Sequence, residues 1–147
     1  MPASSTSAMT LREIQAAIPH RPPMLLVDEV VERTDSTILC RKTFRHDEYF
    51  FQGHYPDYPL VPGVILCEVA MQCGAILLSQ FAGEGVPVAT RMNDVRFRQM
   101  VRPNETVEIH VELVEKLANA FFMKAKISRE GKQVMRFEFA CAAASPT

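Results

Sequence analysis

The clearest pattern along the chain is the alternation of apolar and polar residues in its second half. In TVEIHVELVE, residues 106–115, every second side chain from Val107 is apolar until the last two positions, and its neighbours are polar or charged. Residues 95–99, 121–127 and 133–141 repeat the pattern. A period of two is typical of antiparallel strands that have one buried face and one exposed face. The second half therefore predicts four antiparallel strands.

The N-terminal part predicts a short helix and two further strands. Thr10 is followed three residues later by Glu13, which is the pattern of a capping box, and the amphipathic helix that starts there ends before Pro19. Residues 24–33 and 36–45 are rich in branched apolar residues and are separated by a turn-like TDS. We interpret both segments as strands.

One long helix lies between the two groups of strands, from Gly63 to around Ala82 and Gly83. It is apolar on nearly every side, so it should be buried on most of its circumference. A membrane span is the alternative, but the carboxylate of Glu68 near the middle of a bilayer would cost roughly 2.5–3.5 kcal/mol. A helix buried in a protein core is the better interpretation.

Together these elements predict an α+β fold in which one strongly curved antiparallel sheet wraps around one central helix. We treat residues 1–147 as a single domain and residues 1–9 as a flexible N-terminal tail. The sheet can cover only part of an apolar helix of about 30 Å. We therefore expect a two-fold homodimer that pairs helices or continues the sheet.

Composition and charge narrow the range of functions. Nearly half of the 147 residues are apolar, and the formal net charge is −1. This balance is typical of a globular protein and offers no general attraction to nucleic acid. The first nine residues lack the apolar core of an export signal. The four cysteines and four histidines have no metal-ligand spacing, so we expect reduced, buried thiols in a cytoplasmic protein without a bound metal.

Glu68 is the first candidate for chemistry, because it is a carboxylate in an otherwise apolar helix. Taken alone, it could simply pair with an arginine of the core. Burial, however, favours the uncharged form of a carboxylic acid, and a neutral carboxyl group can donate a proton. Gln72 lies one helical turn further on, where its amide could orient the carboxyl group.

His54 is the second candidate and lies fourteen residues before Glu68. A single histidine in a loop is usually an ordinary surface residue. Here Gly53 allows the backbone to pass closely, and Pro56, Pro59 and Pro62 restrict the loop, which fixes the direction of the imidazole. The backbone N–H groups of Gly63 and Val64 begin the helix and have no partner within it, so they can stabilise negative charge on an oxygen. A base, an acid and an oxyanion site thus lie close together in sequence.

Four segments resemble the β-hydroxyacyl-acyl-carrier-protein dehydratases of the FabZ type. They are IPHRPPMLLVDEV, DEYFFQGHYP, PLVPGVILCEVAMQ and VRFRQMVRPNETVEIHVEL. The resemblance implies a hot-dog fold and a dimer, often assembled by threes into a hexamer. Each active site would take histidine from one chain and glutamate from the other. By position, His54 matches the catalytic histidine, Glu68 the catalytic acid and Gly63 the glycine whose N–H contacts the thioester carbonyl.

The activity implied is dehydration of 3-hydroxyacyl thioesters on acyl carrier protein to trans-2-enoyl thioesters in fatty-acid biosynthesis. Water is the leaving group, so no cofactor is expected. An acyl tunnel needs apolar walls, and an acidic carrier protein needs a basic rim at the tunnel mouth. The candidates for the tunnel are Phe97, Met92 and Ile65. The candidates for carrier docking are Arg96, Arg98 and Arg102.

Three alternatives remain open at this level. A hot-dog dehydratase that also isomerises its product typically carries aspartate at the position of Glu68. A hot-dog thioesterase acting on acyl-CoA or acyl carrier protein has no need of the loop around His54. A non-catalytic acyl-binding paralogue would keep the fold alone. Asp57 and Tyr58 depart from the family pattern, which leaves the substrate entrance undefined.

Overall fold

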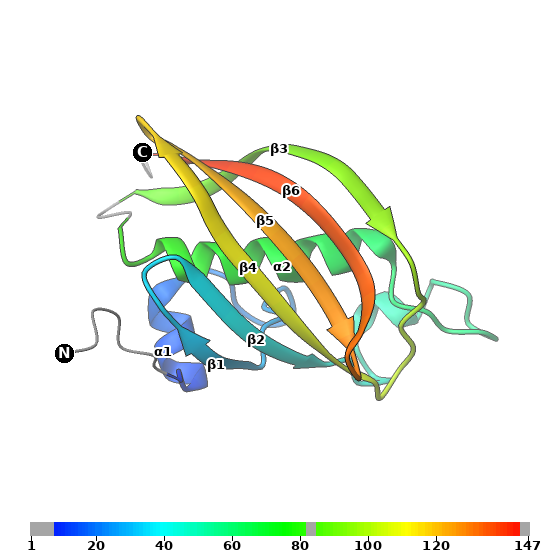
Figure 1. Cartoon of the computed structure of the whole chain (residues 1–147). Coiled ribbons are helices and arrows are strands. Elements are labelled where there is room, and N and C mark those ends of the chain that lie inside the picture. The colour runs from blue at the N-terminus through cyan, green and yellow to red at the C-terminus, as the bar shows by residue number, and fades with distance from the viewer. Residues whose placement is uncertain (1–7, 82–84, 145–147) are drawn as a thin grey trace.

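One six-stranded antiparallel sheet curves around a central helix in the computed structural model, which describes residues 8–81 and 85–144. Figure 1 shows the strands crossing over the helix as a single layer. This arrangement confirms the predicted α+β hot-dog fold. The sheet order is β1-β2-β4-β5-β6-β3. The strands are β1 Glu29–Arg33, β2 Thr37–Thr43, β3 Val86–Phe97, β4 Thr106–Leu117, β5 Ala120–Arg129 and β6 Lys132–Ala144, and the helices are α1 Leu11–Ala17, the 3-10 turn η1 Tyr49–Phe51 and α2 Gly63–Leu78.

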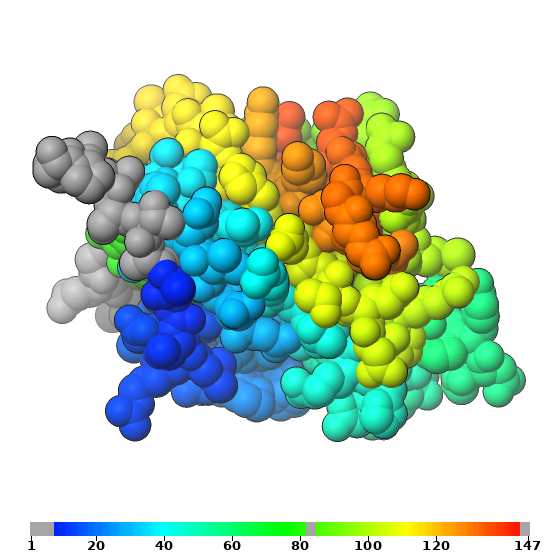
Figure 2. Space-filling view, turned by 60° about the horizontal axis from the view of Figure 1, so that its bottom comes forward, coloured from blue at the N-terminus to red at the C-terminus, as the bar shows by residue number. Residues whose placement is uncertain are grey.

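The core lies between the concave face of the sheet and α2. In β4 the alternating residues Val107, Ile109 and Val111 are fully buried, as their period of two predicts. The hairpin between β5 and β6 turns at Glu130 and Gly131, whose φ angles are 52° and 80°. Such angles favour glycine, which explains the turn at this point. Figure 2 shows the N-terminal elements and β2 beside β4 on one face of the molecule.

The central helix is shorter than the sequence indicates. It ends at Leu78, although its apolar character predicts an end around residues 82 and 83. Residues 82–84 lie outside the described part of the chain. The hydroxyl of Ser79 donates to the carbonyl of Ile76 at 2.7 Å, and the amide of Gln80 donates to that of Leu77 at 3.1 Å. These two polar side chains satisfy carbonyl groups of the last turn and so end the helix early.

Strand β3 is much longer than its alternating segment, residues 95–99, predicts. It begins at Val86, and almost all of its residues are exposed on both faces. It is an edge strand that pairs only with β6, and its register shifts between Ala89 and Arg91 and again between Asn93 and Arg96. Because neither face of β3 is buried within the single chain, apolar and polar residues need not alternate along this strand.

The N-terminal helix forms where predicted. The hydroxyl of Thr10 accepts the N–H of Glu13 at 3.2 Å, and the carboxylate of Glu13 accepts the N–H of Thr10 at 3.0 Å, so both halves of the capping box are present. Of the predicted tail, residues 1–7 lie outside the described residues, whereas Met9 pairs with Val30. None of the described helices is long and apolar enough to cross a membrane.

The four cysteines are free and buried, as the sequence predicts. Burial raises the pKa of the Cys141 thiol to about 11, so the thiol stays protonated at neutral pH.

Gly74 is a point of close approach between α2 and the sheet and gives a test of this packing. A Cβ atom there would lie 2.8 Å from Cζ of Phe139 and 3.4 Å from Cε of Met123, both buried. Gly74→Ala should therefore lower the free energy of unfolding by about 1–2 kcal/mol, even though alanine favours a helix. Urea denaturation measures the change. Gly53→Ala is the matched control, because a Cβ there meets nothing within 4 Å; equal stability of the two variants would contradict the packing.

Candidate active site

His54 lies in the loop between η1 and α2 and is partly buried. Its Nδ1 is 2.9 Å from the carbonyl oxygen of Leu60. A carbonyl oxygen only accepts, so Nδ1 carries the hydrogen, and Nε2 of the neutral ring keeps its lone pair. The ring packs beside Tyr55, with 4.5 Å between the centroids. His54 is thus oriented with a basic nitrogen free.

The loop that carries His54 is fastened at its N-terminal end by a buried ion pair. Lys42 of β2 is 2% exposed, and its Nζ lies 2.8 Å from the carboxylate of Glu48 and 3.5 Å from that of Asp28. Glu48 also accepts the backbone N–H of Arg45 at 2.7 Å. A buried charge is stable only when it is paired in this way. The pair joins β2 to η1 and thereby to the loop.

The far end of the loop is tied to the segment after β3. The N–H of Val61 donates to the carbonyl of Val101 at 2.8 Å. Tyr58 reaches the same region, because its hydroxyl accepts a hydrogen bond from Nη2 of Arg102, whose guanidinium lies 4.9 Å from the tyrosine ring centroid. The departure at Asp57 and Tyr58 thus introduces a contact across the loop.

Glu68 lies in the second turn of α2 with a quarter of its side chain exposed. Nε2 of Gln72 donates to Oε2 of Glu68 at 2.9 Å. The same amide nitrogen donates to the carbonyl of Met24 at 2.8 Å, and the amide oxygen accepts the N–H of Leu26 at 2.8 Å. The two backbone groups fix which end of the amide is nitrogen, so Oε2 of Glu68 must be an acceptor. Among the described residues nothing donates to Oε1.

The beginning of α2 presents two free backbone donors. Pro62 is the residue before the helix, and its carbonyl accepts the N–H groups of Ile65 and Leu66 at 2.9 and 3.3 Å. Within the described residues, the N–H groups of Gly63 and Val64 donate to no backbone or side-chain acceptor. They carry the partial positive charge of a helix N-terminus, where an oxyanion is stabilised.

Phe97 at the end of β3 packs directly on Gly63. A Cβ at Gly63 would lie 2.8 Å from Cζ of the phenylalanine ring, so only glycine fits beneath it. Phe97 is 52% exposed, and Met92 and Val64 are exposed as well. Ile65 differs from these candidate wall residues, because it is buried in the core of the single chain. The structure thus places Phe97 directly against the predicted oxyanion site, and the tunnel roles of Met92 and Ile65 stay predictions.

The three predicted docking arginines have different surroundings. Nε of Arg96 lies 2.8 Å from the carboxylate of Asp94, which holds the pKa of that carboxyl below its usual value and neutralises the guanidinium. Arg102 keeps its charge against the neutral Tyr58 hydroxyl. Arg98 has no ion-pair partner within residues 8–81 and 85–144.

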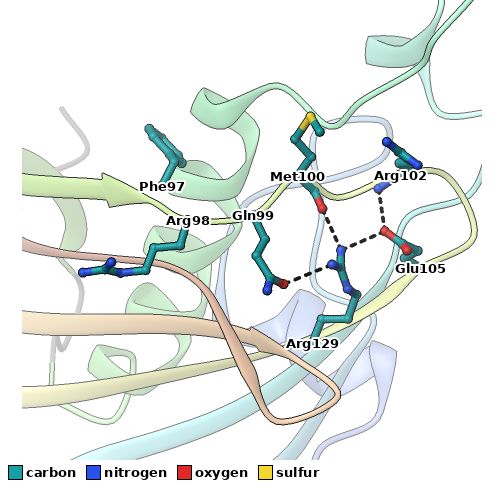
Figure 3. Close-up of a pocket in the computed structure, with 7 residues that line it drawn as sticks. All are labelled: Phe97, Arg98, Gln99, Met100, Arg102, Glu105 and Arg129. Atoms are coloured by element: carbon teal, nitrogen blue, oxygen red, sulfur yellow. Dashed lines mark hydrogen bonds and ion pairs between the residues drawn. The ribbon is translucent and has the colours of Figure 1, made fainter.

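Arg98 and Arg102 line one surface pocket of about 510 Å³ that also contains Arg129 (Figure 3). Arg129 is occupied, since its guanidinium donates to Oε1 of Glu105 at 2.9 Å, to the carbonyl of Met100 at 2.7 Å and to the amide oxygen of Gln99 at 3.1 Å. Of the arginines that line this pocket, Arg98 and Arg102 therefore have no carboxylate partner for their guanidinium groups among the described residues.

His54 and Glu68 are not in contact within the chain. No hydrogen bond or ion pair joins them in the described part of the structure, where Glu68 instead lies 3.8 Å from Nε2 of His20. The sequence pattern predicts neither the approach of His20 to Glu68 nor the contact between Tyr58 and Arg102. These contacts join residues more than forty positions apart, which local spacing does not reveal.

Comparisons with known proteins identify the family of the chain. The model of the ApeI-like family, described as ApeI dehydratase, matches residues 30–138. The chain is 40% identical over 127 residues to the 3-hydroxyacyl-(acyl-carrier-protein) dehydratase FabZ of Clostridium perfringens strain SM101, covering 84% of this chain and 91% of that protein. The FabZ of Oenococcus oeni is 45% identical over 109 residues, covering 71% and 78%.

The fold also matches solved structures. The dehydratase heterocomplex ApeI:P from Xenorhabdus doucetiae contains a chain with a TM-score of 0.79 and 16% identity, and the match covers 90% of this chain and 91% of that one. A hypothetical thioesterase from Streptococcus pneumoniae, solved with coenzyme A, has a TM-score of 0.63 and 12% identity, with 79% and 87% covered. Identities this low are evidence for the shared fold only.

Gln72 is the residue whose loss should disturb this site most. Gln72→Met keeps the shape of the side chain but leaves the backbone groups of Met24 and Leu26 without partners. We expect the free energy of unfolding to fall by about 2–4 kcal/mol, because each buried unpaired group costs about 1–3 kcal/mol. Urea denaturation measures this. Gln52→Met is the control, because the exposed side chain of Gln52 makes no hydrogen bond among the described residues, and it should change the free energy of unfolding by less than about 0.5 kcal/mol; comparable losses would refute the role of the Gln72 amide.

Proposed function

The chain belongs to the FabZ-type family of 3-hydroxyacyl-acyl-carrier-protein dehydratases, and from this premise we propose that it eliminates water from 3-hydroxyacyl thioesters. The substrates are carried on acyl carrier protein, the products are trans-2-enoyl thioesters, and the pathway is fatty-acid biosynthesis. The observation that carries the proposal is the preset polarity of two groups. His54 has Nε2 free to accept a proton, and Glu68 has Oε1 free to donate one.

The reaction needs three groups at once. Nε2 of His54 takes the proton from C2 of the acyl group as general base. The N–H groups of Gly63 and Val64 bind the thioester oxygen and stabilise the negative charge that develops there. Protonated Glu68 gives its proton to the 3-hydroxyl, the C3–O bond breaks, and the C2–H electron pair forms the C2=C3 double bond. Water leaves, and the imidazolium and carboxylate exchange a proton through solvent.

The catalytic pair comes from two chains in this proposal. Among the described residues, no hydrogen bond or ion pair joins His54 to Glu68 of its own chain. Strand β3 has twelve residues and pairs with β6 on one side only, so its outer side has no partner strand in the described sheet, and Val88, Met92 and Phe97 are exposed. A long apolar edge strand seeks a partner strand. Pairing two copies along β3 covers these side chains, and because Phe97 packs on Gly63, it brings the second chain to the start of α2. Three such dimers form the hexamer that the family resemblance implies.

Carrier docking uses the pocket in Figure 3. Arg98 and Arg102 retain their positive charge there, whereas Arg96 is neutralised by Asp94. An acidic carrier is steered by such unpaired cations. The buried, free cysteines fit a reducing compartment, and we place the reaction in the cytoplasm.

Replacing either member of the catalytic pair tests the proposed function. His54→Ala and Glu68→Gln should each lower the rate of enoyl formation by at least about 100-fold, because each removes one proton transfer. The assay follows the absorbance of the enoyl thioester on carrier protein. Release of free thiol, measured in parallel, would instead indicate a thioesterase. No enoyl formation by the unaltered chain with any acyl length would leave a binding role.

Mixing the two variants locates the active site between chains. If His54 and Glu68 meet across a dimer, unfolding and refolding an equal mixture restores one intact site in each mixed dimer. Random pairing then recovers about a quarter of the unaltered activity. Recovery of nothing would place both groups in one chain and refute the shared site.

Charge reversal tests the docking surface. Arg98→Glu should lower kcat/KM for carrier-bound substrate roughly ten-fold at low salt, since it adds a repulsive charge facing an acidic partner. The rate with a small thioester should not change. Arg96→Glu is the matched control, because it makes the same change in net charge at an arginine that is paired with Asp94 and does not line the pocket in Figure 3. Equal losses for both variants, or a loss with the small thioester, would argue against docking at Arg98.

A further inference from the structure

A second histidine stands beside the proposed acid. We propose that His20 is a positioning residue which, as a neutral imidazole, donates its Nε2–H to Oε2 of Glu68. Together with Gln72 it would confine the transferable proton to Oε1. This inference rests on the proposed function, because it concerns the same carboxyl group.

The contact is close and the surroundings are unusual. Nε2 of His20 lies 3.8 Å from Oε2 of Glu68, and the two side chains are 28% and 25% exposed. This separation is longer than a hydrogen bond, and contacts of catalytic groups that are long in the free enzyme often tighten when the reacting complex forms. The other ring nitrogen, Nδ1, is buried and has no hydrogen-bond partner among the described residues. A buried polar atom without a partner calls for an explanation.

The buried Nδ1 decides the tautomer. A hydrogen on Nδ1 would be a buried donor with nothing to accept it, and a doubly protonated ring would bury part of its charge as well. A lone pair on Nδ1 is the less costly choice. The hydrogen therefore lies on Nε2, which faces Glu68. His20 is then a donor to the carboxyl group and not a competitor for its proton.

The backbone around His20 is held at both ends. The guanidinium of Arg21 donates to three carbonyl groups, those of Gln15, Ile18 and His20, at 2.8, 2.9 and 2.7 Å. It therefore faces the end of α1 and not Glu68. Met24 lies four residues after His20, and Gln72 of α2 binds the carbonyl of Met24 and the N–H of Leu26. The imidazole is thus carried by a segment that α1 and α2 fix independently.

Two donors on one oxygen have a chemical consequence. Oε2 of Glu68 would accept from the Gln72 amide and from His20, so the acidic hydrogen must lie on Oε1. When Oε1 gives that hydrogen to the departing hydroxyl, the same two donors stabilise the carboxylate that remains. His20 would therefore lower the barrier to proton donation without touching the substrate.

The arrangement also predicts an unusual stability effect. Keeping Nδ1 buried without a partner costs stability, so a hydrophobic replacement of similar size should be tolerated. His20→Leu should leave the Tm unchanged or raise it. A residue that is needed only for structure would behave in the opposite way.

Three substitutions at His20 test the proposal, with enoyl formation on carrier protein as the assay. The amide nitrogen of glutamine reaches the place of Nε2, whereas that of asparagine reaches the place of Nδ1. His20→Leu and His20→Asn should each lower kcat by about 10- to 100-fold with little change in KM, as expected for loss of a hydrogen bond to a charged group. His20→Gln should restore kcat to within about three-fold of the unaltered chain.

The outcomes separate this inference from the proposed function. An inactive unaltered chain would defeat the proposed function itself. With an active chain, a His20→Leu variant of full kcat would overturn the role of His20 alone. Equal losses in the leucine, asparagine and glutamine variants, accompanied by a lower Tm, would assign His20 to structure and also overturn it. Loss confined to leucine and asparagine at an unchanged Tm supports it.

Discussion

The buried amide of Gln72 is the interaction on which the rest of the site depends. It is 1% exposed and satisfied by three partners, two of them backbone groups of the segment before β1. Those backbone groups fix the amide orientation, and the amide in turn fixes Oε2 of Glu68 as an acceptor. A buried amide with one bond missing would be costly, so each of the three contacts favours the other two. Packing of the N-terminal segment onto α2 therefore helps to orient the carboxyl group of Glu68.

The edge of the sheet that lacks a partner strand among the described residues lies beside the proposed oxyanion site. Strands β2, β4 and β5 pack on α2, whereas β3 contacts the helix but lies at the edge of the described sheet with several apolar side chains exposed. Phe97 at the end of this strand closes over Gly63, where the free N–H groups of α2 begin. The surface that a second chain would cover is thus continuous with the proposed oxyanion site, so under the proposed function assembly and catalysis depend on the same residues.

Local patterns predicted what depends on neighbours in sequence. The capping box at Thr10, the alternation of β4 and the helix around Glu68 each arise within a few residues, and each is present. Sequence reasoning missed most of β3, because periodicity reports burial by the chain itself and β3 has little. It also missed His20, which reaches Glu68 only after α1 and α2 pack together. The residues that flank Glu68 in the sequence do not indicate that His20 lies close to it.

The departure at Tyr58 illustrates how a substitution outside the catalytic groups can change recognition. Its hydroxyl and ring fix the guanidinium of Arg102 without neutralising it, because a phenol carries no charge at neutral pH. A carboxylate in this place would remove the charge, as Asp94 does for Arg96. The loop of His54 thereby presents an immobilised cation beside Arg98. The loop that carries the proposed base is joined through one tyrosine to an arginine of the proposed docking surface, so under the proposed function a change in this loop would alter both substrate delivery and proton abstraction.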